Sequence, residues 1–254
     1  LISSFIFAQD NYEEIAVDSV TIIGTKDDVK DLAGSGAVIS NEDLQKAMDT
    51  DIQKILTAVP GVYMRTEEGY GLRPNISIRG TAIERSGKIT IMEDGILVAP
   101  APYTASSAYY FPTTARIHSV EVLKGPSAVP LGPQSIGGAV NLISTPIPKV
   151  NSGKFIQEFG DNNMTRTHAY YGVNQGNFGA LVEVHEHASD GFDSIANVGG
   201  DTGFDKSDLM IKARYSSGNH SVTFKRVDIE ENSDQSYVGL SQASFNANPR
   251  LLSL

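Results

Sequence analysis

Hydrophobic and polar residues alternate along the chain after Lys154, at the spacing of a half-buried β-strand. The apolar set includes Val182 and Val184 in one run and Leu209 and Ile211 in another. One face of each strand is therefore apolar and the opposite face is more polar. The pattern predicts about five strands in this part of the chain.

The connections between these strands differ in length. Tight turns are expected at residues 176–177 and 218–219, which are Gly-Asn pairs. Residues 188–206, rich in Gly and Asp, and the polar chain after Glu231 are expected to form long loops.

A first strand at residues 154–159, with its loop at 160–163, places the tight turns on one rim and the longer loops on the other. That arrangement is typical of an outer-membrane barrel. A soluble β-sandwich would alternate in the same way, so the pattern leaves both open. The run 220–230 is less regular, and we expect a bulge in it.

Earlier in the chain the period is helical. Ser40 with Asp43, and Thr50 with Gln53, have the spacing of capping boxes. Apolar residues follow at helical spacing and end at residues 60–61, a Pro-Gly pair. The pattern predicts two short helices, each of which must pack on something to be stable.

Strand patterns follow the helices. They comprise residues 76–80, 89–99, 118–125 and 139–145. Asp94 and Gly95 divide the second of them and are expected to form a hairpin turn, because Gly tolerates a positive φ. Residues from about 30 to 148 are thus expected to form a compact mixed α/β unit.

The N-terminal residues have two features of their own. The run 17–25 is rich in β-formers but is flanked by acidic residues, so we expect an exposed, loosely held segment. The first residues resemble the end of a signal peptide, with Ala8 at the cleavage site; the alternative is an N-terminal strand. We expect the chain to be truncated at both ends.

Composition removes several classes of function. The formal charge is −10 without a basic run, which argues against nucleic-acid binding. Cys is absent, so thiolate zinc sites, disulfides and Cys nucleophiles are excluded. The sequence also lacks the run of about 18 apolar residues that a membrane-spanning helix requires.

The Gly- and Pro-rich stretch at residues 122–141 is not a phosphate-binding loop. It lacks the Lys-Ser/Thr end of a P-loop and leads into a strand, whereas nucleotide loops lead into a helix. We interpret it as a stiff connection between two strands.

Other candidate chemistry is weak. Glu183, His185 and His187 share one strand face, which would suit a metal, but the polar face of a barrel strand explains them better. Asp18 and Asp94 have no catalytic partner in the sequence, so we expect no enzyme activity. A basic group could attract an anion: Arg73, Arg79, Arg85 and Lys88.

The order of motifs resembles the TonB-dependent outer-membrane receptors, and the resemblance extends over nearly the whole chain. Within that family the blocks at residues 71–80, 93–103 and 131–141 are most similar to the ferric dicitrate receptors. The motifs are "DSVTI" (18–22, the TonB box), "LTAVPGV" (56–62), "ISIRG" (76–80), "IMEDGILV" (91–98), "VEVLKGPSAV" (120–129) and "QSIGGAVNLIST" (134–145).

The resemblance implies a mixed α/β plug domain followed by the first antiparallel strands of a 22-stranded transmembrane β-barrel. The domains would be a signal-peptide remnant (1–8), a flexible N-terminus with the TonB box (9–29), the plug (30–150) and a partial barrel (151–254). The protein would lie in the outer membrane of a Gram-negative bacterium, in contact with its lipid.

The implied function is import of a ferric chelate, with ferric citrate as the expected cargo. TonB, acting with ExbB and ExbD, would supply the energy; no cofactor, resident metal or nucleic acid is implied. Two alternatives remain: another cargo (cobalamin, another siderophore or metal chelate, or a saccharide), or a secreted β-rich adhesion or scaffold protein.

The resemblance also assigns site residues. The TonB box would comprise Asp18, Ser19, Val20, Thr21 and Ile22. Ligand contacts at the plug apex would come from Arg85, Ser86, Lys88, Tyr103, Tyr109 and Tyr110. Arg79 and Lys124 would pair with carboxylates of the barrel wall.

Overall fold

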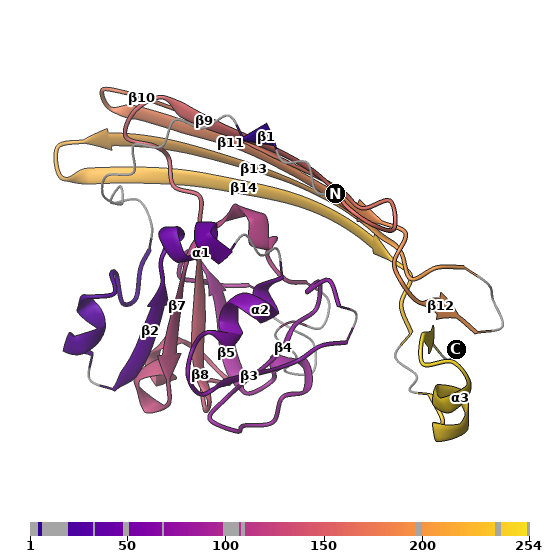
Figure 1. Ribbon diagram of the computed structural model, residues 1–254. Coiled ribbons are helices and arrows are strands. Elements are labelled where there is room, and N and C mark those ends of the chain that lie inside the picture. The colour runs from indigo at the N-terminus through magenta and orange to yellow at the C-terminus, as the bar shows by residue number, and fades with distance from the viewer. Residues whose placement is uncertain are drawn as a thin grey trace. The chain divides into compact units, whose positions relative to one another are not determined.

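The structure is a computed structural model that describes residues 5–6, 20–32, 34–47, 51–67, 69–98, 107, 110–196, 200–236 and 240–252. The chain divides into two compact units (Figure 1). We call Val17–Pro146 the plug unit, and Ile147–Leu254 together with Leu1–Ala16 the strand unit. Among the described residues, no helix is long and apolar enough to cross a membrane.

A five-stranded sheet forms the centre of the plug unit, in the order β2-β7-β8-β5-β6. Strand β7 is antiparallel to both β2 and β8, whereas β5 runs parallel to β8. The strands are β2 (Ser35–Ile39), β5 (Ile89–Glu93), β6 (Ile96–Leu97), β7 (Ile117–Lys124) and β8 (Gly138–Ser144).

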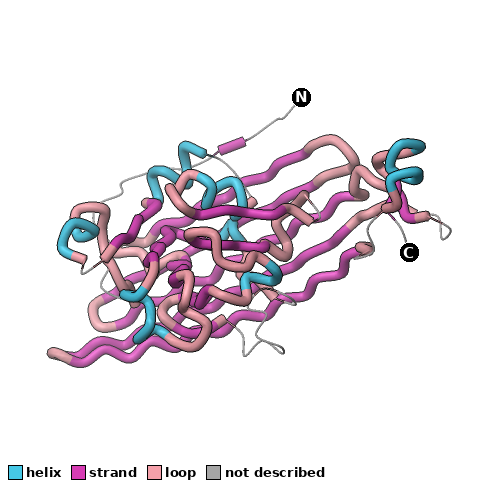
Figure 2. Tube along the Cα trace, turned by 90° about the horizontal axis from the view of Figure 1, so that it is seen from below, coloured by secondary structure: helices cyan, strands magenta, loops and turns pink. Residues whose placement is uncertain are grey.

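Smaller elements surround this sheet. The α-helices are short, as Figure 2 shows, and a separate hairpin pairs β3 with β4. The elements are α1 (Asn41–Ala47), α2 (Ile52–Thr57), β3 (Val62–Arg65), β4 (Asn75–Ile78) and the 3-10 turns η1 (Asp28–Asp31), η2 (Glu84–Ser86), η4 (Thr114–Arg116) and η5 (Pro126–Leu131).

One face of the sheet carries the main apolar core. Val122 of β7 and Leu142 of β8 are fully buried there and cluster with Leu56 of α2, which is also fully buried. Helix α2 turns the apolar side of its short amphipathic pattern onto this face, which is how a helix of six residues is stabilised.

The opposite face of the sheet has a smaller apolar cluster. Met92, Leu123 and Ala139 project from β5, β7 and β8 and pack with Ile23 and with Ala128 of η5. Both faces are therefore covered, which explains why β7 and β8 are buried along almost their whole length.

The two helices begin at different kinds of cap. Ser40 N–H donates to the Asp43 carboxylate over 2.8 Å, as the capping box predicts. The second box is wrong in its first residue: Asp51 caps α2 by accepting from Gln53 N–H at 2.8 Å. Thr50 lies outside the described residues. Asp and Thr are both favoured at helix N-caps, and the two residues are adjacent in the sequence, so spacing alone did not distinguish them.

The hairpin at Asp94 and Gly95 is confirmed. These residues have φ values of 49° and 76°, as a tight two-residue turn between β5 and β6 requires. The Asp94 carboxylate also accepts from Ser144 N–H at 2.9 Å, which ties the turn to the end of β8.

The Gly- and Pro-rich connection leads from β7 through η5 into β8, and so joins two strands as expected. Gly125 N–H donates to Gly137 O across its base at 3.0 Å. Gly138 has a φ of 145°, and an added Cβ would lie 2.1 Å from the Leu123 carbonyl oxygen. Close approach of two strands is thus the reason for glycine at position 138.

The strand unit is a six-stranded antiparallel sheet in the order β1-β9-β10-β11-β13-β14, whose long strands lie side by side in Figure 1. Its elements are β1 (Phe5–Ile6), β9 (Ser152–Phe159), β10 (Thr165–Gln175), β11 (Phe178–Ser189), β13 (Phe204–Ser217) and β14 (His220–Ser233); β12 (Ser194–Ile195), α3 (Gln242–Ala247) and β15 (Leu251–Leu252) lie outside it. Residues 5–6, in the segment expected to be a signal-peptide remnant, pair here with β9, as the alternative strand would.

Both predicted tight turns are confirmed. Two residues connect β10 to β11, and two residues connect β13 to β14. The expected bulge in residues 220–230 is wrong. Strands β13 and β14 pair without a register shift from Ser217 with His220 to Phe204 with Ser233. The irregular sequence there reflects mixed side chains on a regular backbone.

The two faces of the strand unit differ as predicted. Exposed apolar side chains occupy one face, among them Tyr171, Val182, Val184 and Phe224. The opposite face carries polar residues that have little exposure, and several of them are paired. The polar set includes Arg166, His168, Glu183, His185, Lys206 and Asp208.

The stability of the start of α1 should depend on acid pH. The Lys26 ammonium, 2.6 Å away, and the cap from Ser40 lower the pKa of Asp43 from 3.8 to about 2. A lowered pKa stabilises the folded state above the ordinary pKa, and that contribution is lost as the pH falls from about 4 to about 2.

Asp43→Asn should therefore flatten this pH dependence and cost about 1 kcal/mol or less at neutral pH, because the pair is largely solvent-screened. Amide protection of residues 40–47, corrected for the intrinsic exchange rate at each pH, measures it. Equal pH slopes in wild type and Asp43→Asn would contradict the assignment.

Candidate functional site

A buried carboxylate holds the N-terminal end of the plug unit. Glu121 lies on β7 and has no exposed surface. Its two carboxylate oxygens accept from the main-chain N–H groups of Ile22, Ile23 and Gly24, at 2.8, 2.9 and 2.7 Å. Successive N–H groups that converge on one anion form a nest, which offsets the cost of burying the charge.

Asn141 of β8 completes this contact and is also fully buried. Its amide nitrogen donates to Glu121 at 2.8 Å and to the Val20 carbonyl at 3.0 Å, and its amide oxygen accepts from Gly95 N–H at 2.9 Å. We call residues 20–24 the N-terminal segment, and Glu121 with Asn141 the anchor pair.

The predicted TonB box overlaps this segment. Val20 and Thr21 are exposed and Ile22 is half-buried, whereas Asp18 and Ser19 lie outside the described residues. Residues 20–25 do not form a strand although they are rich in β-formers, because the Glu121 carboxylate takes the N–H groups of residues 22–24 and Asn141 takes the Val20 carbonyl. The expected loosely held segment is therefore tied to the sheet from Val20 onward.

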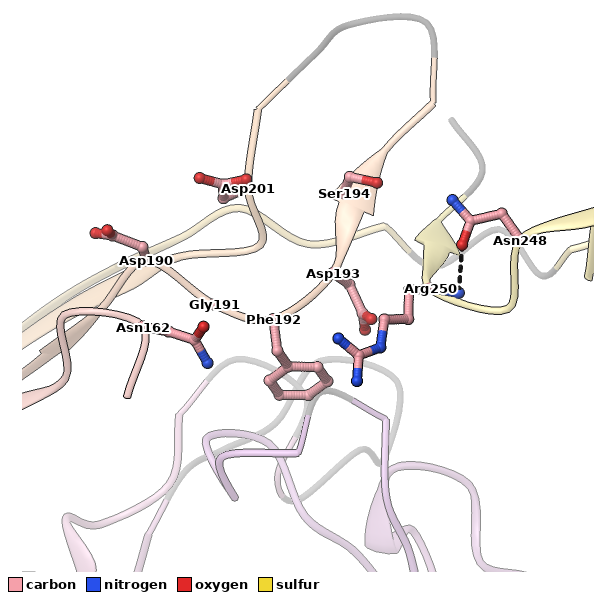
Figure 3. A pocket seen from close by; sticks show the side chains of 9 residues that line it. All are labelled: Asn162, Asp190, Gly191, Phe192, Asp193, Ser194, Asp201, Asn248 and Arg250. Atoms are coloured by element: carbon pink, nitrogen blue, oxygen red, sulfur yellow. Dashed lines mark hydrogen bonds between the residues drawn. The ribbon is translucent and has the colours of Figure 1, made fainter. Parts of the chain in front are cut away.

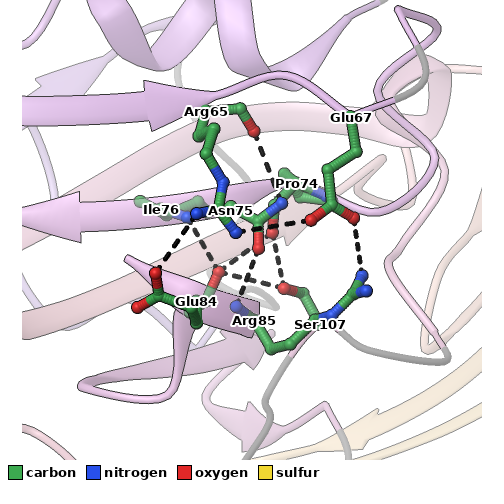
Figure 4. Close-up of polar contacts among 9 residues, drawn as sticks. Arg65, Glu67, Pro74, Asn75, Ile76, Glu84, Arg85 and Ser107 are labelled. Atoms are coloured by element: carbon green, nitrogen blue, oxygen red, sulfur yellow. Dashed lines mark hydrogen bonds and ion pairs between the residues drawn. The ribbon is translucent and has the colours of Figure 1, made fainter. Parts of the chain in front are cut away.

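The two loops expected at the plug apex do meet (Figure 4). Ser107 N–H donates to the Arg85 carbonyl at 3.4 Å, and the Ser107 hydroxyl lies 2.9 Å from that of Ser86. Ser86 is buried; it accepts from Ile76 N–H at 2.9 Å and donates to Pro74 O at 3.0 Å. Its hydroxyl thus joins loops instead of facing solvent.

Arg85 is partly exposed and is paired with an acid. Its guanidinium lies 2.7 Å from Glu67, which also contacts Arg65 at 3.4 Å, and Arg65 reaches Glu84 at 3.2 Å. Two Arg and two Glu side chains therefore form a balanced network (Figure 4). Lys88 is exposed just before β5 and adds a positive charge outside this network.

Tyr110 is the one tyrosine of the three expected at the apex that the structure describes. Tyr103 and Tyr109 lie outside the described residues. The Tyr110 hydroxyl accepts from Arg116 at 3.1 Å, beside the buried ion pair of Arg116 with Glu93 at 2.7 Å. Glu93 ends β5 and Lys88 precedes it, so the structure places Tyr110 and Lys88 at opposite ends of that strand.

Arg79 and Lys124, expected to pair with the barrel wall, are neighbours within the plug unit. The Lys124 ammonium donates to the Pro60 carbonyl at 2.7 Å, and burial, aided by the nearby Arg79 charge, lowers the pKa of Lys124. Among the described residues of the plug unit, no carboxylate pairs with either cation. They therefore form a small positive site at the end of β7.

The strand unit has two polar features. His168 contacts Glu183 at 2.7 Å, and rings of His168, His185 and His187 lie in succession, yet the described residues contain no group arranged to hold a metal. The other feature is a pocket among the loops (Figure 3), lined by Asn162, Asp190, Gly191, Phe192, Asp193, Ser194, Asp201, Asn248 and Arg250. Burial raises the pKa of Asp193 there, although Arg250 opposes it.

The chain thus consists of a mixed α/β unit, whose N-terminal segment is held by a buried carboxylate, and a unit of long antiparallel strands with one exposed apolar face. The family model of the TonB-dependent receptor plug domain matches residues 28–139. The ferric citrate transporter FecA, in its unliganded form, is 26% identical with a TM-score of 0.74.

The match to FecA covers 89% of this chain and 35% of the FecA chain. The siderophore receptor PirA from Acinetobacter baumannii is 20% identical with a TM-score of 0.63, over 82% of this chain and 33% of PirA. The ferric yersiniabactin uptake receptor FyuA from Yersinia pestis is 19% identical with a TM-score of 0.66, over 80% of this chain and 32% of FyuA.

The last two similarities show the fold alone. Residues 28–139 are a TonB-dependent receptor plug domain, and the resemblance of this chain to TonB-dependent receptors is confirmed. The family consists of receptors and not of enzymes, in agreement with the expectation. This chain spans about a third of the length of the receptors it matches.

The anchor pair was not predicted from the sequence, although a signal was present. Glu121 lies between Val120 and Val122, and Asn141 lies between Val140 and Leu142. A polar residue inside a strand that is covered on both faces needs buried hydrogen-bond partners, so this pattern indicates a buried polar contact at Glu121 and Asn141.

Ser86→Ala should loosen the apex. The substitution leaves the buried Ile76 N–H without its acceptor, which costs about 1–3 kcal/mol locally, whereas Pro74 O still accepts from the Ser107 hydroxyl at 2.5 Å. Amide protection of residues 74–86 measures the loss, with the exposed Lys88→Ala as control. Equal protection in both variants would show that Ser86 does not join the loops.

Proposed function

We propose that this chain belongs to an outer-membrane receptor that imports a ferric chelate with energy from TonB. The observation that carries the proposal is the plug domain at residues 28–139 together with 26% identity to FecA over 89% of the chain. Ferric citrate is the first candidate cargo, because it is what FecA transports.

The strand unit supports a place in the membrane. Its apolar face exposes aromatic and aliphatic side chains at positions that would meet lipid in a barrel. Within the part of the chain that the structure describes, strand β14 pairs only with β13, and a closed wall would need further strands. We propose that they complete a barrel around the plug, in the outer membrane of a Gram-negative bacterium.

TonB would dock on the predicted box by adding a strand edge to edge, through main-chain hydrogen bonds. Val20 is 60% exposed and lies at the surface end of the N-terminal segment. The main chain there does not pair with a strand of the plug unit within the described residues, so a partner can reach it. ExbB and ExbD would drive TonB from the inner membrane.

The apex would receive an anionic chelate. Arg85 and Lys88 supply positive charge. The ion pair with Glu67 holds Arg85 in place but weakens the positive potential that Arg85 presents to a ligand. Ser86 supports the loop from within, and Tyr103, Tyr109 and Tyr110 remain predicted contacts of the ligand. Arg79 and Lys124 would pair with carboxylates of the completed wall. No cofactor or resident metal takes part, since iron enters only as cargo.

Val20→Pro should block import without blocking ligand binding. Proline removes a main-chain donor and restrains the residue before it, so an added strand cannot pair normally. The described contacts of the plug use the Val20 carbonyl and not its N–H, so the resting plug keeps its anchor pair.

Uptake of iron-55 citrate by cells with the full receptor measures this, and Val20→Ala is the matched control. We expect Val20→Pro to fall to the level of a strain without TonB while surface binding persists. Uptake that survives in Val20→Pro would refute docking at this residue, and uptake that survives without TonB would refute the proposed function.

The two apex cations should differ in their effect on ligand affinity. Arg85→Ala removes a cation and leaves Glu67 facing the ligand, so affinity for ferric citrate should fall about tenfold, which is about 1.4 kcal/mol. Lys88→Ala should cost less, and Glu67→Gln should raise affinity. Binding to the full receptor at fixed ionic strength tests all three; an order independent of charge would place the ligand elsewhere.

A further inference from the structure

The N-terminal segment is attached to the plug in an unusual way. None of the described backbone hydrogen bonds joins residues 20–24 to a strand. Among the described residues, the attachment comprises the anchor pair, the buried side chain of Ile23, the smaller apolar contacts of Ile22 and Val20, and the exposed ion pair of Lys26 with Asp43. An exposed ion pair contributes little, so the anchor pair and Ile23 dominate.

The carboxylate of Glu121 has no spare acceptor capacity. One oxygen accepts from Ile23 and Gly24, and the other accepts from Ile22 and from Asn141. No basic side chain of the described residues pairs with it. Three of its four donors therefore belong to the very segment that must leave if the predicted TonB box is to be pulled.

We propose that Glu121, positioned by Asn141, is a release latch that controls when the N-terminal segment, residues 20–24, becomes available to a docking partner. This inference rests on the proposed function and deepens it. Glu121 is a positioning residue: it holds the main chain and contacts neither cargo nor partner.

The latch releases as a unit. Removing one N–H from Glu121 leaves a buried carboxylate short of donors, which is unfavourable, so partly detached states are scarce. Departure of all three N–H groups removes Ile23 as well and lets water reach the carboxylate. A strand ladder of the same length would instead open one residue pair at a time.

Asn141 links the latch to the rest of the sheet. Its oxygen accepts from Gly95 in the β5–β6 turn, while its nitrogen holds Glu121 and Val20. Val20 also lies against this turn, because a Cβ added at Gly95 would be 2.6 Å from a Val20 methyl group. Movement of the β5–β6 turn would thus shift the Asn141 side chain, and with it the hydrogen bonds of Asn141 to Glu121 and to Val20.

The test measures exposure of Thr21, which is on the segment and points to solvent. Thr21→Cys reports exposure as its rate of maleimide labelling without ligand, in a full receptor in which any Cys outside these 254 residues, which contain none, is replaced. We expect the labelling rate to rise in the order wild type, Glu121→Gln, Glu121→Ala, with an increase of at least about tenfold for Glu121→Ala. The reason is that hydrogen bonds to a charged acceptor stabilise a structure more than those to a neutral one, and Glu121→Ala removes all of them. Asn141→Ala should lie between the extremes.

Val122→Ala is the matched control. Val122 is the next residue on β7 and is fully buried, but it faces the main core. The Val122→Ala substitution weakens the sheet without removing a contact of the latch. Amide protection of residues 138–144 measures how much each variant weakens the sheet. An equal rise in labelling for Val122→Ala at equal protection would overturn the latch, since general loosening would explain the result.

A second measurement separates this inference from the proposed function. Capture of the purified periplasmic domain of TonB by the ligand-free receptor should increase in Glu121→Gln and remain at the wild-type level in Val122→Ala. Unchanged labelling with TonB-dependent uptake would sink the latch and leave the function intact. Faster labelling in a receptor whose uptake ignores TonB would support the latch and refute the function.

Discussion

The plug depends on burying one negative charge correctly. Glu121 lies at the centre of a sheet that is apolar on both sides, and an unsatisfied carboxylate there would be very costly. The protein satisfies it with main-chain N–H groups from a segment nearly a hundred residues earlier in the chain. Folding of the sheet and attachment of the N-terminal segment therefore depend on each other, because the segment supplies the donors that the buried carboxylate needs.

The sheet divides this work between its faces. Alternate residues of β7 serve different layers: Val120 and Val122 face the helices, while Glu121 and Leu123 face the N-terminal segment and η5. The helical side is sealed by apolar packing, which has no direction and tolerates small shifts. The other side combines a smaller apolar cluster with directed hydrogen bonds to the N-terminal segment, and under the proposed latch it is the side that would open without disturbing the main core.

Much of this architecture was predictable, because it rests on local rules. The cap at Ser40, the turn at Asp94, the tight turns between long strands and the alternation of their faces follow from spacing and from the conformational freedom of glycine. What failed was non-local. The N-terminal segment was expected to be exposed and loosely held, but the N–H groups of residues 22–24 bind Glu121, a partner that composition does not reveal.

The candidate site divides in the same way. Two loops that the resemblance assigned to the apex do lie in contact, since Ser107 contacts Arg85 and Ser86, while their role in ligand binding stays a prediction. Sequence could not show that Ser86 is buried or that Glu67 neutralises Arg85, because both depend on loops that meet only in the folded chain. Charge counted along a sequence overstates the field where acids and bases pair in space.

The position of β2 has a mechanical consequence. This strand is at the edge of the sheet, pairs only with β7, and follows soon after the N-terminal segment. Its first residue, Ser35, pairs with Lys124, so tension arriving from the N-terminus would act on the pairs of β2 in succession, like a zipper. Tension from the N-terminus would first load β7 and β8 through Glu121 and Asn141. Once those contacts had released, it would separate β2 from β7 before it reached the pairing among β5, β7 and β8.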